Sequence, residues 1–223
     1  MTIGVEFGSR IVPVGPPASE LLAKDPEATI PETIDANDSE QKRMKLSLWD
    51  TAGQETYKSI TRSYFRGASG ALLVFDISRR NTFDAVTGWL NDLRQIAAEH
   101  IEVILVGNKS DLAPSSLVSD GHQAQNKRQV TKEEAEEWCR VNKVFRYVET
   151  SAKNGNGVER AFLEVAERIY ENIEAGKYDL NDRRSGVKGP GAGGGRSARQ
   201  GVDLSKGGND AGKNGNQGWG KCC

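Results

Sequence analysis

Residues 43–55 read RMKLSLWDTAGQE, and this stretch decides the fold that we expect. Apolar and polar side chains alternate through Met44, Leu46 and Leu48, which predicts a strand with one buried face. The alternation ends at Asp50, where a threonine, a glycine and a glutamine follow on what must be a loop. A strand that leaves a core and runs into such groups presents them to a ligand or a partner.

An alternation of strands and helices follows this stretch. The apolar runs ALLVFDI (71–77) and EVILVG (102–107) are typical of strands that are buried on both faces of a parallel sheet. The spacing of apolar residues predicts helices over about 82–99, 131–142 and 158–175, and FRYVET at 145–150 predicts a further strand. Together these elements predict a doubly wound, mostly parallel α/β domain.

The remaining segments differ from this pattern. Residues 3–14 predict a strand at the edge of a sheet, because Pro13 is tolerated only near an edge. The Pro-rich, acidic segment 15–42 predicts a long disordered loop. The Gly-rich end of the chain lacks core periodicity, so we expect a domain over 1–176 and a flexible tail over 177–223.

Composition limits the class of protein. With 36% apolar and 27% charged residues and a net charge of −1, the chain is ordinary for a soluble globular protein, and nothing in it predicts a nucleic-acid partner. Three cysteines cannot form a disulfide framework and indicate a reducing compartment. No run of 18 apolar residues predicts a membrane span, and the two isolated histidines predict no zinc site.

Three predicted strands end in polar clusters, DTAGQE, NKSD and TSAK, and ligands of such sheets bind at the carboxyl ends of strands. In NKSD, the carboxylate of Asp111 can accept from both the N1–H and the exocyclic amine of guanine, a pair of donors that adenine lacks. Lys109 can lay its stem over the base, and Asn108 can tie neighbouring loops. In TSAK, residues 151–153 offer a backbone N–H for the guanine carbonyl. The alternative is a solvated turn.

The cluster DTAGQE at 50–55 has a different logic. Asp50 can reach the shell of a Mg²⁺ ion, Gly53 lets its backbone N–H approach a terminal phosphate, and Gln54 can orient an attacking water. The alternatives are a helix cap for Asp50 and an exposed loop amide for Gln54.

These motifs resemble those of the Rab branch of the Ras-like small GTPases, most closely the endosomal subgroup numbered four. TIGVEFG (2–8) is similar to the switch I segment, and WDTAGQE (49–55) to switch II. YFRGA (64–68) and LLVFDIS (72–78) are similar to Rab-specific stretches. The resemblance implies a P-loop NTPase-like fold and a switch that hydrolyses GTP to GDP with Mg²⁺ and regulates vesicle trafficking and endosomal recycling.

The resemblance also implies roles for individual residues. Thr2 matches the switch I threonine that holds Mg²⁺ and senses the terminal phosphate. Phe7, Trp49 and Tyr64 match the aromatic triad that Rab effectors contact, although ordinary core or surface aromatics are the alternative. The implied sites are catalytic Gln54; nucleotide-binding Thr2, Gly53, Asn108, Lys109, Asp111, Ser151, Ala152 and Lys153; metal-binding Thr2 and Asp50; and effector-binding Ile3, Gly4, Val5, Glu6, Phe7, Trp49 and Tyr64.

The tail ends in Cys222-Cys223, which resembles the double geranylgeranylation site of Rab proteins. Two prenyl chains, at about 0.8 kcal/mol per buried CH₂, would give lasting membrane residence. The alternative is a frayed terminus with two idle thiols. The implied partners are effectors, an exchange factor, a GTPase-activating protein, a GDP-dissociation inhibitor, an escort protein and a prenyltransferase, and the implied location is the cytosolic face of endosomal and vesicle membranes, in exchange with the cytosol.

One part of the family pattern is missing. The sequence holds no G-x-x-x-x-G-K-[ST] run, whose amides and lysine would cradle the phosphates. In the family this run follows a first strand that lies mid-sheet, between the strands predicted at 44–49 and 71–77. We therefore expect an N-terminally incomplete chain that is inactive as written. The alternatives are a noncatalytic effector-binding protein and an adenine-specific ATPase, which Asp111 disfavours.

Overall fold

The computed structural model describes residues 5–20, 41–113, 126–180 and 186–189. A compact unit runs from Met1 to Gly189. The second unit, Pro190–Cys223, lies outside the described residues.

The described strands are β1 (Val5–Pro13), β2 (Arg43–Thr51), β3 (Gly70–Asp76), β4 (Glu102–Asn108) and β5 (Arg146–Glu149). The helices are α2 (Lys58–Phe65), α3 (Arg80–Asp84), α4 (Val86–Ile96), α5 (Lys132–Asn142) and α6 (Val158–Glu174), with 3-10 turns η1 (Glu55–Tyr57) and η2 (Ser110–Leu112). Strands β3, β4 and β5 form a parallel sheet in that order, and β1 pairs with β2 as an antiparallel hairpin. The predicted α/β fold is confirmed.

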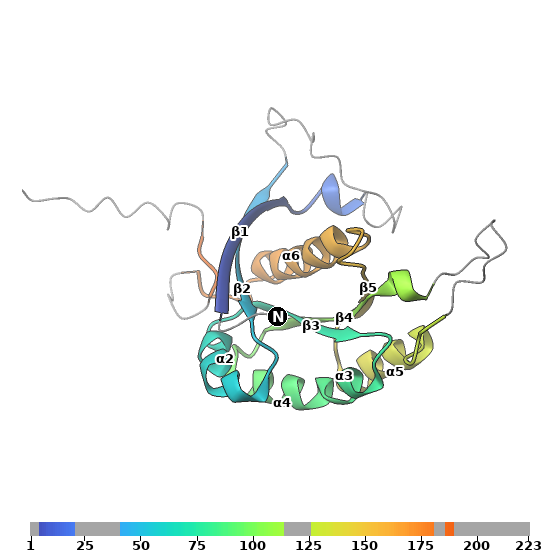
Figure 1. Cartoon of the computed structure of the whole chain (residues 1–223). Coiled ribbons are helices and arrows are strands. Elements are labelled where there is room, and N and C mark those ends of the chain that lie inside the picture. The colour runs from blue at the N-terminus through green and yellow to red at the C-terminus, as the bar shows by residue number, and fades with distance from the viewer. Residues whose placement is uncertain (1–4, 21–40, 114–125, 181–185, 190–223) are drawn as a thin grey trace, which may run out of the picture. The chain divides into compact units, whose positions relative to one another are not determined.

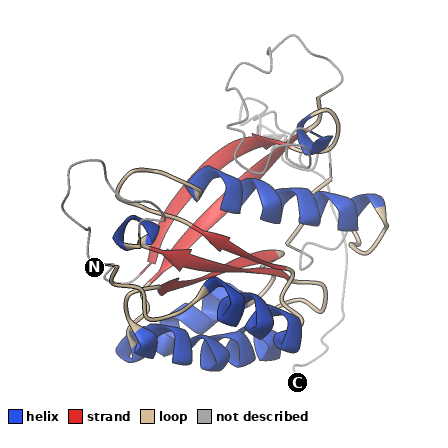
Figure 2. Cartoon of the chain, turned by 90° about the vertical axis from the view of Figure 1, so that its right-hand side faces the viewer, coloured by secondary structure: helices blue, strands red, loops and turns tan. Residues whose placement is uncertain are grey.

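The parallel sheet lies between two layers of helices (Figures 1 and 2). Helix α6 covers one face, where Val165 and Ile169 pack on Ile104 and Val106 of β4. Helices α3, α4 and α5 cover the other face (Figure 1). The apolar run of β4 is buried along almost its whole length, as the sequence predicts for a strand between two helical layers.

The hairpin and the parallel sheet are separate. Among the described strands, β2 pairs only with β1 and β3 only with β4, so each presents an edge without a ladder partner. Helix α6 packs against both sheets, and Met44 of β2 contacts the core clusters on each side. The prediction that 71–77 is buried on both faces is wrong for β3, where Val74 is 58% exposed, because one edge of the strand has no described neighbour.

The ends of the predicted loop at 15–42 are ordered, which corrects the prediction of disorder there. Residues 18–20 are helical, and Ala18 is buried. The side chain of Gln41 accepts a hydrogen bond from the amide of Ala18 and donates one to the carbonyl of Val14, at 3.1 and 2.8 Å. The buried side chain of Gln41 therefore joins the two ends of the segment. Residues 21–40 lie outside the described part.

The predicted helices are present with local differences. The helix expected at 82–99 is divided at Ala85 into α3 and α4. Thr131 caps α5, because its hydroxyl accepts from the amide of Glu134 at 3.2 Å. The carboxylate of Glu134 pairs with Arg80 of α3 at 2.6 Å. This bond links two helices of the same layer.

The packed unit extends past residue 176. Tyr178 is buried against the α6 side of the core, and its hydroxyl donates to the carbonyl of His100 at 2.9 Å. The first residues of the expected tail therefore pack on the domain. Within the described ranges, no helix combines the length and the apolarity that crossing a bilayer requires.

Candidate functional site

The loops that follow β4 and β5 meet at one edge of the sheet, because the two strands are parallel and in register. Asn108, the last residue of β4, joins them: its side-chain oxygen accepts from the amides of Lys109 and Ala152 at 2.8 and 3.0 Å. The backbone adds a bond from the amide of Ser110 to the carbonyl of Thr150 at 3.0 Å. The structure thus brings the NKSD and TSAK clusters together.

Asp111 is positioned by Ser151. The Ser151 hydroxyl, completely buried, donates to one carboxylate oxygen of Asp111 at 2.6 Å. This bond restrains the orientation of the carboxylate. Recognition of two adjacent N–H donors requires an oriented carboxylate. Ala152 and Lys153, which follow Ser151, are exposed.

The turn after Ser151 depends on a glycine. The amide of Gly155 donates to the carbonyl of Ser151 at 2.8 Å. The amide of Ser151 donates to the carbonyl of Asn156 at 2.9 Å. Gly157 has a φ of +68°, and a Cβ there would lie 2.2 Å from the carbonyl oxygen of Glu149. Only glycine fits at this close approach.

The structure adds Asp76, which sequence reasoning missed. The ammonium group of Lys109 pairs with the carboxylate of Asp76 at 2.6 Å, and Lys109 has a φ of +69°. Burial raises the pKa of Asp76, but hydrogen bonds from Lys109 and Ser78 outweigh it and hold that pKa below its ordinary value. The signal in the sequence was its position at the end of the apolar run LLVF, opposite Asn108 in the ladder.

The DTAGQE cluster lies at the end of β2 and in the loop before α2. Asp50 stands opposite Glu6 in the hairpin, and a Cβ at Gly53 would meet nothing within 4 Å. The hydroxyl of Thr61 in α2 donates to the carbonyl of Ala52 at 3.3 Å. The loop is therefore held to its own following helix, with open space at the glycine.

The three predicted effector-binding aromatics form one cluster. The ring of Trp49 lies 4.8 Å from that of Phe7 and 4.9 Å from that of Tyr64, between centroids. Phe7 is 61% exposed, and Trp49 is 50% exposed. Aromatic rings that contact one another and remain exposed are typical of recognition surfaces.

Several predicted site residues lie outside the described part, namely Thr2, Ile3, Gly4, Cys222 and Cys223. Val5 and Glu6 are in β1, with Val5 opposite Thr51 of β2.

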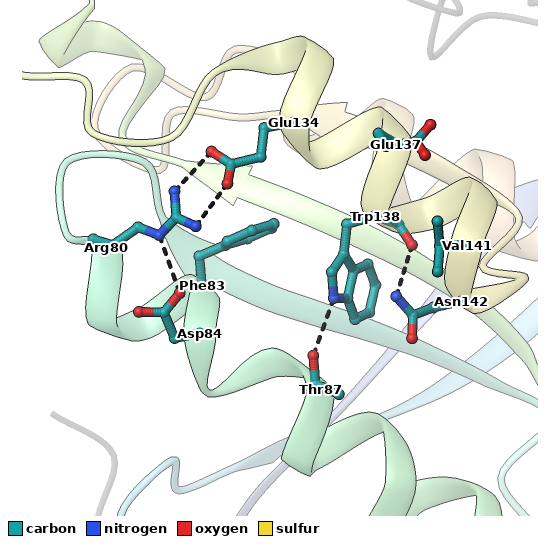
Figure 3. A pocket seen from close by; sticks show the side chains of 9 residues that line it. All are labelled: Arg80, Phe83, Asp84, Thr87, Glu134, Glu137, Trp138, Val141 and Asn142. Carbon is teal, nitrogen blue, oxygen red and sulfur yellow. Dashed lines mark hydrogen bonds and ion pairs between the residues drawn. The ribbon is translucent and has the colours of Figure 1, made fainter.

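A groove of about 420 Å³ lies away from these loops. Helices α3 and α4 form one of its walls, and helix α5 forms the other (Figure 3). Arg80 bridges its walls by pairing with Asp84 and Glu134 (Figure 3). The indole N–H of Trp138 donates to the hydroxyl of Thr87 at 3.0 Å. None of the predicted site residues lines this groove. The described residues contain no group of three or more His, Cys, Asp or Glu that could hold a metal ion.

A model of the Ras family matches residues 20–171, a range that includes β2 to β5 and the NKSD and TSAK loops. The chain belongs to the Ras family. This is a family of small GTPases, whose members bind guanine nucleotides and Mg²⁺. The match in this Ras-family chain begins after β1, so residues 5–13 lie outside it.

The described residues fit one part of such a nucleotide. An oriented carboxylate at Asp111, the bridging side chain of Asn108 and the exposed residues that follow Ser151 suit a guanine base. The phosphates are not matched in the same way, because the 223 residues contain no G-x-x-x-x-G-K-[ST] run. Asp50 is a single carboxylate near the expected phosphate position, and one carboxylate is no metal site by itself.

Proposed function

We propose that this Ras-family chain is a Rab-type GTP switch of vesicle trafficking and endosomal recycling. The observation that carries the proposal is the joining of the NKSD and TSAK loops, with Ser151 holding the carboxylate of Asp111. That carboxylate would accept from the N1–H and the exocyclic amine of guanine, and Lys109 would lie along the base. An adenine base that covers this carboxylate would leave it without its pair of donors, which costs about 1–3 kcal/mol.

The switch part of the proposal rests on the hairpin and α2. Val5, Glu6 and the Phe7–Trp49–Tyr64 cluster would form the surface that effectors contact, together with residues 2–4. Gln54 would orient the attacking water. Hydrolysis also needs a phosphate-binding loop, which the 223 residues do not supply, so we derive no step at the phosphates for this chain.

Cys222 and Cys223 would carry prenyl groups, and the tail before them is basic, with nine Lys/Arg against four Asp/Glu from Lys177 onward. Such a tail would hold the protein on the cytosolic face of endosomal or vesicle membranes, where anionic lipids attract it. Effectors, an exchange factor, a GTPase-activating protein, a GDP-dissociation inhibitor, an escort protein and a prenyltransferase are the proposed partners.

A second function is favoured by the missing phosphate cradle. In it, the chain binds effectors through the exposed aromatic cluster without a nucleotide-dependent switch. The two functions differ in one respect: an effector-binding pseudo-GTPase would bind its partners equally well with and without GTP.

The experiment is a titration of the ¹⁵N-labelled chain with GTP and with ATP in the presence of Mg²⁺. We expect GTP to shift the amide signals of Ser110, Ala152 and Lys153 at about tenfold or more lower concentration than ATP. The variant Asp111→Ala should lose this preference. Equal response to both nucleotides, or a preference for ATP, would overturn guanine recognition.

A further inference from the structure

A half-buried ion pair lies behind the two guanine-recognition loops. The guanidinium group of Arg128 contacts both carboxylate oxygens of Glu149, at 2.7 and 2.9 Å. The side chains of both residues are only 16% exposed. Pairs of this two-point geometry are the strongest and the most specific in direction that side chains make.

The pair is braced on both sides. The Tyr147 hydroxyl donates to the Glu149 carboxylate at 2.9 Å, and Arg128 also donates to the carbonyl of Val130 at 3.1 Å. Val130 is completely buried, and its amide donates to the carbonyl of Ile77. The carbonyl of Val130 therefore helps to orient the guanidinium group of Arg128 toward Glu149.

The position of the pair in the chain links it to both loops. Glu149 ends β5 and comes two residues before Ser151, the partner of Asp111. The amide of Lys127, next to Arg128, donates at 3.0 Å to the carbonyl of Leu112, which follows Asp111 directly. One short segment thus contacts, by its backbone, the residue that follows NKSD and, by a side chain, the residue that precedes TSAK.

We propose that Arg128 and Glu149 are positioning residues that set the distance between Asp111 and the loop at 151–153. The inner connections between these loops are the Ser151–Asp111 hydrogen bond and the bonds through Asn108 and Thr150, and the segment 127–128 is the outer connection. Without the outer connection the carboxylate of Asp111 loses its fixed orientation toward the base. The functional consequence of this inference rests on the proposed guanine recognition. The positioning of Asp111 relative to residues 151–153 does not depend on it.

The first test uses amide hydrogen exchange of the whole chain and needs no nucleotide. Arg128→Met keeps most of the side-chain length and removes the charge. We expect the amides of Ser110 and Ala152 to exchange about tenfold or more faster, whereas the central β4 amides change less. Arg128→Lys, which keeps one contact, should restore part of the protection. An unchanged rate at both amides, or an equal increase throughout the domain, would overturn the proposal.

The matched control is Arg140→Met. Arg140 makes the same two-point contact with Glu137, but both side chains are more than half exposed on α5. Exposed pairs contribute little, so the exchange of Ser110 and Ala152 should not change in this variant.

The second test compares GTP with inosine triphosphate, which lacks the exocyclic amine. A displaced Asp111 can no longer accept a hydrogen bond from that amine. Arg128→Met should therefore reduce the preference for GTP over inosine triphosphate about tenfold. A residue that only stabilises the fold would lower the affinity for both nucleotides and leave their ratio unchanged, which would contradict a positioning role. If the original chain shows no GTP preference, the proposed function fails, while the exchange result still decides the geometric part.

Discussion

The two ends of the candidate site are built differently. Where β4 and β5 end, side chains and backbone from both loops bond to one another through Asn108, Thr150 and the Ser151–Asp111 pair. Where β2 ends, the DTAGQE loop is held to its own helix α2, and no ladder joins β2 to β3 among the described strands. The loops after β4 and β5 are therefore preorganised by neighbouring strands, whereas no described strand pairs with the second edge of β2.

The largest expected effect contrasts a core residue of the parallel sheet with a residue of the hairpin. Leu105 of β4 is completely buried and Ile11 of β1 is 64% exposed. Leu105→Ala should lower the free energy of unfolding by about 2–5 kcal/mol, because it leaves a cavity in a packed layer. Ile11→Ala should change it by about 0.5 kcal/mol or less.

Denaturant unfolding of the two variants provides the measurement. Equal losses of stability for Leu105→Ala and Ile11→Ala would show that the hairpin contributes to the core as much as the parallel sheet does, against the comparison above.

A smaller effect is expected where Ser151 holds Asp111. Ser151→Ala removes the hydroxyl that orients the carboxylate but leaves the backbone bonds of the loop in place. The affinity for guanine nucleotides should fall about tenfold, with the affinity for adenine nucleotides unchanged. Competition between GTP and ATP measures both, and a parallel fall of the two affinities would contradict a role in base recognition.

The pH dependence should differ in sign between Glu149, at the candidate site, and Glu167, where α6 contacts the chain after β1. Burial raises the pKa of Glu149, but hydrogen bonds from Arg128 and Tyr147 hold it below the ordinary value of 4.5. Burial raises the pKa of Glu167 on α6, although the amide of Gly15, at the end of the hairpin, donates to its carboxylate at 2.8 Å. A lowered pKa gives stability that is present above the ordinary pKa and lost as the pH falls, and a raised pKa acts in the opposite direction.

The check is unfolding of Glu149→Gln and Glu167→Gln at pH 7 and at pH 4. At pH 7, Glu149→Gln should destabilise the domain by about 1–3 kcal/mol, and Glu167→Gln should leave it unchanged or stabilise it by about 1 kcal/mol. Both differences should shrink at pH 4. Destabilisation of similar size in both variants at pH 7 would remove the contrast.

The order of elements was predictable because each has a local signal. The apolar run of β4 and the helical spacing over 131–142 are examples, and both elements are present in the structure. The polar clusters at strand ends were also predictable, since parallel strands place their carboxyl ends together. The functional roles of these clusters stay predictions.

The remaining features depend on contacts between distant residues. The Lys109–Asp76 pair requires the register of β3 on β4, which places Asp76 opposite Asn108. Arg128 and Glu149 are 21 positions apart, in segments without a shared pattern. The partial exposure of β3 follows from which strands pair, and no local pattern in ALLVFDI carries that information.

The central claim is that these residues recognise the guanine base but hold no cradle for the phosphates. The most direct measurement compares guanosine with GTP as ligands of the 223-residue chain in Mg²⁺, followed through the amides of Ser110 and Ala152. We predict that the two bind within about tenfold of one another, because the phosphates gain no preorganised amides. Tight GTP binding that depends on Mg²⁺ and exceeds guanosine binding by several orders of magnitude would contradict the account.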